Sequence, residues 1–97
     1  MANIISGSTT VTTAGTRVPI VASTNRQKAA WISIQNDHAT ATVYAGGPDI
    51  SSTTGTKIGP GLEYTYPVIP ASPYMLRNIW IDSDTNTTVV RWQAGVA

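Results

Sequence analysis

The sequence predicts an all-β domain, an antiparallel β-sandwich of about seven short strands with jelly-roll or Greek-key connections. Short apolar runs alternate with turn residues, and no stretch of ten residues has a convincing helical period. Threonine and serine make up about a quarter of the chain, which also contains 8 glycines and 6 prolines. The apolar residues are mostly β-branched, tyrosine or tryptophan, and these side chains suit a pleated, half-buried surface.

The length of 97 residues is that of one domain. We expect residues 14–97 to form a single β-sandwich domain, preceded by residues 1–13 as an N-terminal extended arm or an edge strand. Ile4, Ile5 and Val11 are the larger apolar residues of this first segment, too few to anchor a central strand. An arm on a neighbouring subunit could pair with a sheet edge, with Ile4 and Ile5 in shallow pockets. The alternative is pairing within its own sandwich.

The first half of the domain contains three predicted strands. Residues 17–21 form a short strand that Pro19 restricts to an edge or a strand end. Residues 30–35 form the clearest strand, with Ile32 and Ile34 on one face. Residues 36–41 form a polar turn into a strand at residues 42–45, so these two strands are predicted to form a hairpin.

The second half begins with a Ser/Thr-rich loop at residues 51–57. A turn follows at Ile58-Gly59-Pro60-Gly61, because proline followed by glycine favours type II geometry. Residues 62–68 alternate, with Leu62, Tyr64 and Tyr66 on one face, and three prolines then favour an extended connection.

Two strands complete the predicted sandwich. Residues 76–81 form one, with Ile79 and Ile81 on the same face. Residues 82–88 form an Asx-rich hairpin turn, and residues 89–93 the last strand, on which Val90 and Trp92 share a face.

Charge and cysteine content argue against several classes of partner. The formal net charge is +1, and the six scattered cations form no basic stripe, so we expect no nucleic-acid partner. There is no cysteine, which excludes disulfides and metal–thiolate sites. No signal-peptide pattern or apolar run of about 20 residues occurs, so we expect no membrane partner.

The sequence predicts no catalytic, metal or cofactor site, and therefore no enzyme. His38, the single histidine, lies beside Asp37 in a polar turn, and zinc needs several such ligands. Glu63 is the only glutamate, with no acidic partner that the sequence can place. The segment Asp82-Ser-Asp84-Thr-Asn86 resembles the start of a calcium loop, but Thr87 and Gln93 stand where glycine and glutamate are required, so a turn is expected.

The aromatic residues predict an interaction surface. If Ile32 and Ile34 face the core, Trp31 points outward, and Ile79 and Ile81 turn Trp80 outward in the same way. The alternative is that these strands are covered on both faces. Outward tryptophans indicate burial by a partner. The candidate interface residues are Trp31, Trp80, Ile4, Ile5, Tyr64 and Tyr66.

Four segments between about residues 29 and 93 resemble small virion proteins of tailed bacteriophages: Trp31-Ile-Ser-Ile-Gln-Asn36, Thr42-Val-Tyr-Ala-Gly-Gly47, Gly59-Pro-Gly61 and Ile79-Trp-Ile-Asp82. The resemblance implies a β-sandwich that decorates or cements the outer capsid surface. It implies binding to the major capsid protein, assembly as a homotrimer, synthesis in the host cytoplasm and no catalytic residues. The chain departs from the pattern by its additional aromatic residues at Tyr64, Tyr66, Trp80 and Trp92.

Two other functions remain open at this point. A carbohydrate-binding sandwich module could use Trp31, Trp80, or Tyr64 with Tyr66 as platforms on which sugars stack. A subunit of a tail or head fibre is the third interpretation.

Overall fold

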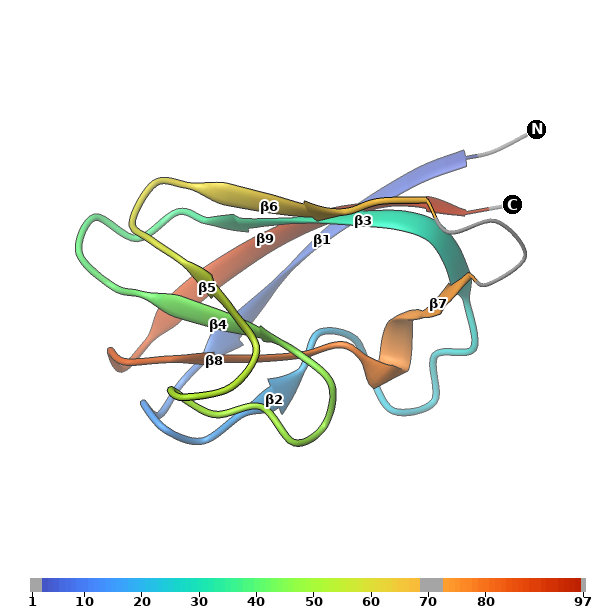
Figure 1. Ribbon diagram of the computed structural model, residues 1–97. Helices are drawn as coiled ribbons and strands as arrows, with labels where there is room; N and C mark the ends of the chain where they lie inside the picture. Colours follow the sequence, from blue (N-terminus) through green and yellow to red (C-terminus); the bar gives the residue numbers. More distant parts are fainter. Residues whose placement is uncertain (1–2, 69–72, 97) are drawn as a thin grey trace.

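The computed structural model describes residues 3–68 and 73–96, which form two stacked antiparallel sheets (Figure 1). The first sheet has the order β1-β9-β3-β6, with β7 beside β3, and the second has the order β2-β8-β4-β5. The predicted antiparallel β-sandwich is therefore confirmed. The strands are β1 (Asn3–Val11), β2 (Val18–Pro19), β3 (Lys28–Asn36), β4 (Val43–Gly46), β5 (Thr56–Ile58), β6 (Glu63–Tyr66), β7 (Tyr74–Met75), β8 (Trp80–Ser83) and β9 (Thr88–Val96).

The strand pairing is that of a jelly roll. The pairs β1–β9, β2–β8, β3–β6 and β4–β5 join early strands to late ones, from the outermost pair inward. A long antiparallel double ribbon that is rolled into two layers has these pairs, and jelly rolls are built in this way. The short β7 is an addition beside β3.

Two connections that the sequence predicted as hairpins instead cross between the layers. β3 and β4 belong to different sheets, and so do β8 and β9. The first crossing is held by the buried side chain of Asn36, whose Nδ2 donates to the carbonyl oxygens of Ala41 at 2.7 Å and Ile58 at 3.1 Å. Both hairpin predictions were therefore wrong. The turn after β3 is fixed by a contact between residues 22 positions apart, which local sequence does not show.

The other differences between the predicted and the observed secondary structure involve short elements. β5 lies partly in a predicted loop, β7 lies in the predicted extended connection, and residues 69–72 of that connection fall outside the described residues. A 3₁₀ helix at Leu76–Asn78 replaces the start of the strand predicted at residues 76–81. Leu76 is buried and its backbone N–H donates to the carbonyl of Gln27 at 3.2 Å, so packing outweighs local strand propensity there.

The turn after β5 agrees with the predicted type II geometry. Gly61 has a φ of +71°, which favours glycine, and the N–H of Leu62 donates to the carbonyl of Gly59 at 3.1 Å. The N–H of Asn36 in turn donates to the Leu62 carbonyl at 2.9 Å, which joins the turn to the end of β3.

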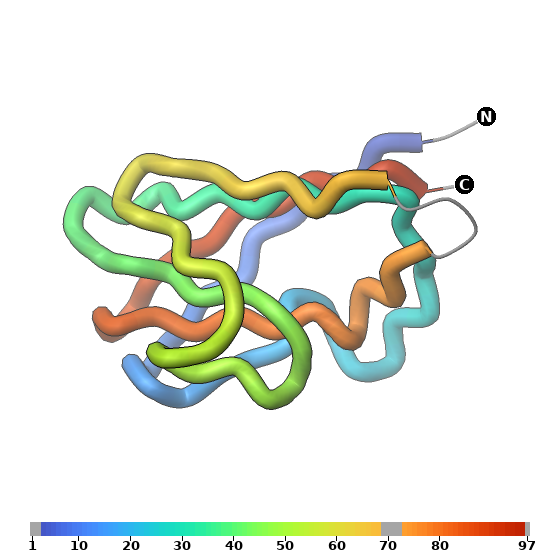
Figure 2. The backbone as a smooth tube through the Cα atoms, viewed as in Figure 1, coloured from blue at the N-terminus to red at the C-terminus, as the bar shows by residue number. Residues whose placement is uncertain are grey.

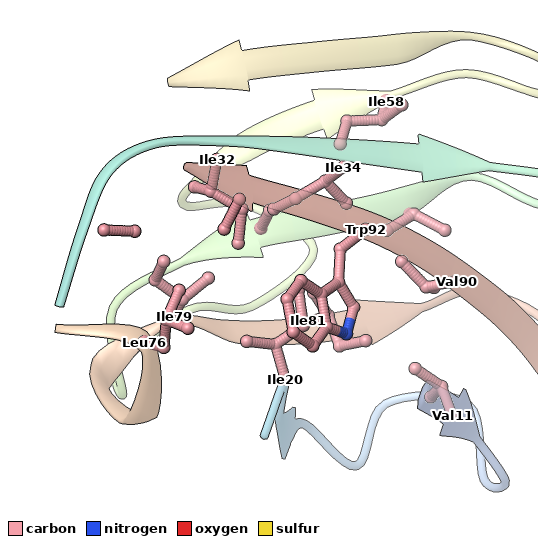
Figure 3. Packing of buried hydrophobic residues seen from close by; sticks show 14 of the residues in the cluster. Val11, Ile20, Ile32, Ile34, Ile58, Leu76, Ile79, Ile81, Val90 and Trp92 are labelled. Carbon is pink, nitrogen blue, oxygen red and sulfur yellow. The ribbon is translucent and has the colours of Figure 1, made fainter. Parts of the chain in front are cut away.

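The core lies between the two sheets (Figure 3). Ile32 and Ile34 of β3 and Ile81 of β8 point into it, as the alternating pattern predicted. Val90 and Trp92 of β9, which were predicted to share a face, also point into the core. The remaining buried members of the cluster are Val11, Ile20, Ala29, Val43, Ala45, Ile58, Leu76, Ile79, Ala94 and Val96.

The N-terminal segment lies in its own sandwich. β1 pairs with β9 from Asn3↔Val96 to Val11↔Thr88, so it is the edge strand of the first sheet and both ends of the described chain lie at one end of the molecule (Figure 2). Among the described residues, the structure has no helix of sufficient length and hydropathy to span a membrane.

Candidate interaction surfaces

Trp31 lies on the outer face of the first sheet and is half-buried. It is directly opposite Gly95 of β9, and a Cβ atom on Gly95 would overlap the indole ring. The absence of a side chain at Gly95 therefore lets the ring lie flat across the neighbouring strand. Part of the indole remains exposed as an apolar surface on this face.

Trp80 lies on the outer face of the second sheet and is also half-buried. Its neighbours in the sheet are Pro19 of β2 and Gly46 of β4. With Thr16 and Arg17 it lines an open hollow of about 490 Å³. The two predicted tryptophans are consequently on opposite faces of the sandwich, and no single flat partner surface can cover both.

Tyr64 and Tyr66 lie at the open side of the sandwich between β6 and β5. Their rings meet edge to face with centroids 4.9 Å apart, and Tyr66 is 5.9 Å from the ring of Tyr74. Tyr66 packs against the core, while 39% of Tyr64 is exposed. The Tyr66 hydroxyl donates to Thr56 Oγ1 at 3.3 Å and so links the edge strands of the two sheets.

The tyrosine cluster borders an apolar cavity of about 250 Å³, whose lining includes Tyr66, Tyr74, Met75 and Ile79. Burial raises the pKa of the Tyr66 hydroxyl above its ordinary value, and the hydrogen bond to Thr56 opposes that shift. Tyr74 was not predicted as a site residue. Its hydroxyl donates to the carbonyl of Pro67 at 2.6 Å, a contact that no local sequence pattern indicates.

Ile4 and Ile5 lie on opposite faces of β1. Ile4 is 68% exposed on the outer face, whereas Ile5 points inward and packs against the core. The structure therefore leaves only Ile4 of this pair available to a partner.

The polar residues considered for catalysis hydrogen-bond backbone or side-chain groups of their own sheet and turns. Asp37 and Glu63 both line an open polar hollow of about 260 Å³. The Nδ1 atom of His38 accepts the backbone N–H groups of Thr40 at 3.1 Å and Ala41 at 3.0 Å, which shapes the turn after β3. Glu63 Oε2 accepts from Ser33 Oγ and Gln35 Nε2, both at 3.3 Å.

The segment that resembles a calcium loop is a turn whose carboxylates accept backbone N–H groups. Asp82 Oδ1 accepts from the N–H of Ser83 at 2.7 Å, and Asp84 Oδ1 accepts from the N–H of Thr42 at 2.9 Å. This last bond, and a second from the Thr85 hydroxyl, lower the pKa of Asp84. Within residues 3–68 and 73–96, no three acidic or histidine side chains come together as a metal would require.

Sequence reasoning missed the packing of Trp92 on β1. Gly7 is directly opposite Trp92, and a Cβ on Gly7 would lie 2.8 Å from the indole ring. The ring enters the core between the sheets (Figure 3), and its buried Nε1 has no hydrogen-bond acceptor among the described residues. An isolated glycine in a strand pattern is the signal that could have indicated close approach by a large side chain.

The fold and these surfaces define a jelly-roll β-sandwich with apolar residues exposed on the outer face of the first sheet and beside β6, and with the half-buried Trp80 on the outer face of the second sheet. No protein-family model matches the chain, and no curated protein matches it. Among solved structures, the chain is similar to one from the acidic stable capsid structure of Helicobacter pylori bacteriophage KHP30, with a TM-score of 0.54 and 11% identity. The likeness covers 99% of this chain and 87% of that chain, and at this identity it concerns the fold.

Proposed function

We propose that this chain is a structural protein of a bacteriophage virion that decorates the outer capsid surface and cements neighbouring major capsid protein subunits. The single observation that carries this proposal is the likeness in fold, over nearly the whole chain, to a chain of a phage capsid structure. The sequence resemblance to small phage virion proteins supports the same conclusion from different data.

The mechanism is mechanical. A protein that binds the assembled lattice, but not the free capsid subunits, stabilises the shell by mass action. Trp31 and Trp80 lie on opposite faces, and Leu62 and Val68 near β6 are each more than 60% exposed, so apolar contacts are available on several sides of the domain. Such a domain can contact two subunits at once across a joint in the lattice.

The test is reconstitution. Capsids that lack this chain are incubated with the purified protein, sedimented and heated. We expect co-sedimentation, density at the outer surface by cryo-electron microscopy, and a higher temperature of capsid disruption. Absence of binding to capsids would contradict the proposal. Density in a tail or fibre would instead identify the chain as a tail or head-fibre subunit.

Trp80→Ser gives the residue-level version of this test. The variant removes an apolar group from the outer face of the second sheet, and we expect weaker capsid occupancy with an unchanged fold by circular dichroism. Val89→Ser is the comparison variant for the outer face of the first sheet, where Val89 is an exposed apolar residue, and the two losses of occupancy show which face the capsid covers.

A non-catalytic role is part of the proposal. A broad hydrolase screen on the purified chain is expected to find no turnover. Activity that disappears in His38→Ala or Glu63→Gln would overturn this part without affecting the capsid-binding test.

The second candidate function is carbohydrate binding, and the tyrosine cluster is the observation that favours it. Tyr64 offers a partly exposed ring beside a cavity that Tyr66 and Asn78 line. Retention on a glycan array that Tyr64→Ala abolishes would support this function, and retention without capsid binding would replace the first proposal.

A further inference from the structure

Five described strands have a neighbour on one side only, and four of them carry features that block pairing with another chain. β7 has two residues and directly follows Pro73. β2 has two residues, one of which is Pro19, and β5 has three residues that include Lys57. β6 has four residues, begins with Glu63 and is followed by Pro67. Short length, charge and proline are the means by which proteins protect their sheet edges from association.

The fifth edge, β1, has none of these features. It contains nine residues without charge or proline, and its pairing with β9 runs over its whole length without a register shift. Alternate residues of such a strand direct their backbone N–H and C=O groups away from the sheet. The exposed edge is therefore a template for one more strand.

The side chains of β1 specify the chemistry of that strand. The outer row, which is largely exposed, contains Ile4, Ser6, Ser8 and Thr10. An open hollow of about 450 Å³ beside Ser8 and Thr9 is also lined by uncharged residues. A neutral, β-prone strand fits this edge, whereas a charged strand finds no counter-charge along it.

We propose that the free edge of β1 pairs antiparallel with β1 of a second copy of this chain, across a two-fold axis. Antiparallel pairing of a strand with itself is self-complementary, and this is the property that a two-fold interface requires. With the axis perpendicular to the sheet, the outer row of one copy lies beside the outer row of the other. Ser and Thr side chains then meet across the seam.

This contact goes beyond the proposed function and does not depend on it. A closed two-fold pair has twice the chain mass of 10.2 kDa, whereas the homotrimer implied by the resemblance has three times that mass. The two arrangements are thus distinguished in solution, without any capsid.

Sedimentation equilibrium of the intact protein is the test. We expect the wild type to be a dimer and Ser6→Lys to weaken dimerisation at least about tenfold, because two like charges would lie close to each other across the seam. Gln93→Lys is the matched control: Gln93 is the direct neighbour of Ser6 on β9, on the same face but one strand from the seam. It should dimerise as the wild type does.

A second measurement separates charge repulsion from misfolding. An equal mixture of Ser6→Lys and Ser6→Glu chains should dimerise again, and the circular dichroism spectrum of each monomer should match that of Gln93→Lys. A monomeric or trimeric wild type, or a Ser6→Lys variant that dimerises normally, would overturn the proposal. A monomer whose capsid binding is lost in Ser6→Lys would also overturn it, since the edge would then serve another chain.

Discussion

The two open sides of the sandwich are closed by aromatic residues in different ways. Between β6 and β5, Tyr66 packs against the core while its hydroxyl hydrogen-bonds Thr56, and Tyr74 caps the carbonyl of Pro67. Between β1 and β2, Trp92 lies on Gly7 and its Nε1 has no acceptor among the described residues. One polar contact, from Thr9 Oγ1 of β1 to the carbonyl of Ile20 directly after β2 at 2.6 Å, joins the two layers on that side.

The difference separates two sources of stability. The tyrosine side combines apolar contact with hydrogen bonds that reach the rim, so it can lose one group and keep the rest. The tryptophan side depends on the packing of the Trp92 ring directly on Gly7, which has no side chain. Close packing of this kind responds strongly to a change in side-chain volume. Substitutions on the tryptophan side should therefore cost more.

Trp92→Ala is expected to have the largest effect. Removal of a buried indole leaves a cavity between the sheets and should lower the free energy of unfolding by about 3–5 kcal/mol, as measured by urea denaturation. Trp31→Ala is the control, because its half-buried ring lies on the outer face and its loss should cost about 1–2 kcal/mol. Equal losses at the two tryptophans would contradict the comparison.

Gly7→Ala tests the same contact from the other strand. The new methyl group meets the Trp92 ring, so we expect a loss of about 1–3 kcal/mol in the free energy of unfolding. Gly47→Ala is the control, since a Cβ there would make only an ordinary contact with Asp49 at 3.5 Å. In a Trp92→Leu background the cost of Gly7→Ala should disappear, and additive costs would rule out a direct clash.

Tyr66→Phe tests the tyrosine side and should cost about 0.5–1.5 kcal/mol, the usual value of one hydrogen bond. Thr56→Val removes the same bond from the acceptor's side, and the double variant should cost no more than the larger single loss. A loss as large as that of Trp92→Ala would mean that the two sides do not differ.

The smallest effect is a dependence on pH. Because burial raises the pKa of Tyr66 above the unfolded value of 10.0, the folded state holds this proton more tightly than the unfolded state does. Its contribution is fully present below pH 10.0 and is lost as the pH rises through the folded pKa. Chemical denaturation at increasing alkaline pH should show this decline in wild type, and Tyr66→Phe should reduce its slope.

The sequence predicted which face of a strand is buried better than it predicted which strands pair with each other. Ile32 with Ile34 and Val90 with Trp92 face the core because strand side chains alternate, a property that any local segment displays. The crossings from β3 to β4 and from β8 to β9 depend on distant contacts such as that between Asn36 and Ile58, which alternation does not encode.

The candidate interaction surfaces also combine features that local sequence predicts with features that depend on distant contacts. The outward positions of Trp31 and Trp80 follow from their isoleucine neighbours. The partial cover of Trp31 depends on its register against Gly95, and the contact of Tyr74 with Tyr66 depends on the path of the chain, so neither could be predicted from local sequence.

Pairing of the first strand with the last also constrains how the protein is made. β1 ends at Val11 and its partner β9 ends at Val96, so a ribosome must add some 85 residues before the pair can be completed. At about 5–20 residues per second that interval is on the order of ten seconds, during which β1 has no native partner in the chain. Closure between such distant segments is slow in all-β proteins, where folding takes milliseconds to seconds. The uncharged β1 is then exposed on the nascent chains of neighbouring ribosomes on one messenger RNA. Dense loading of ribosomes should therefore favour premature association between these chains.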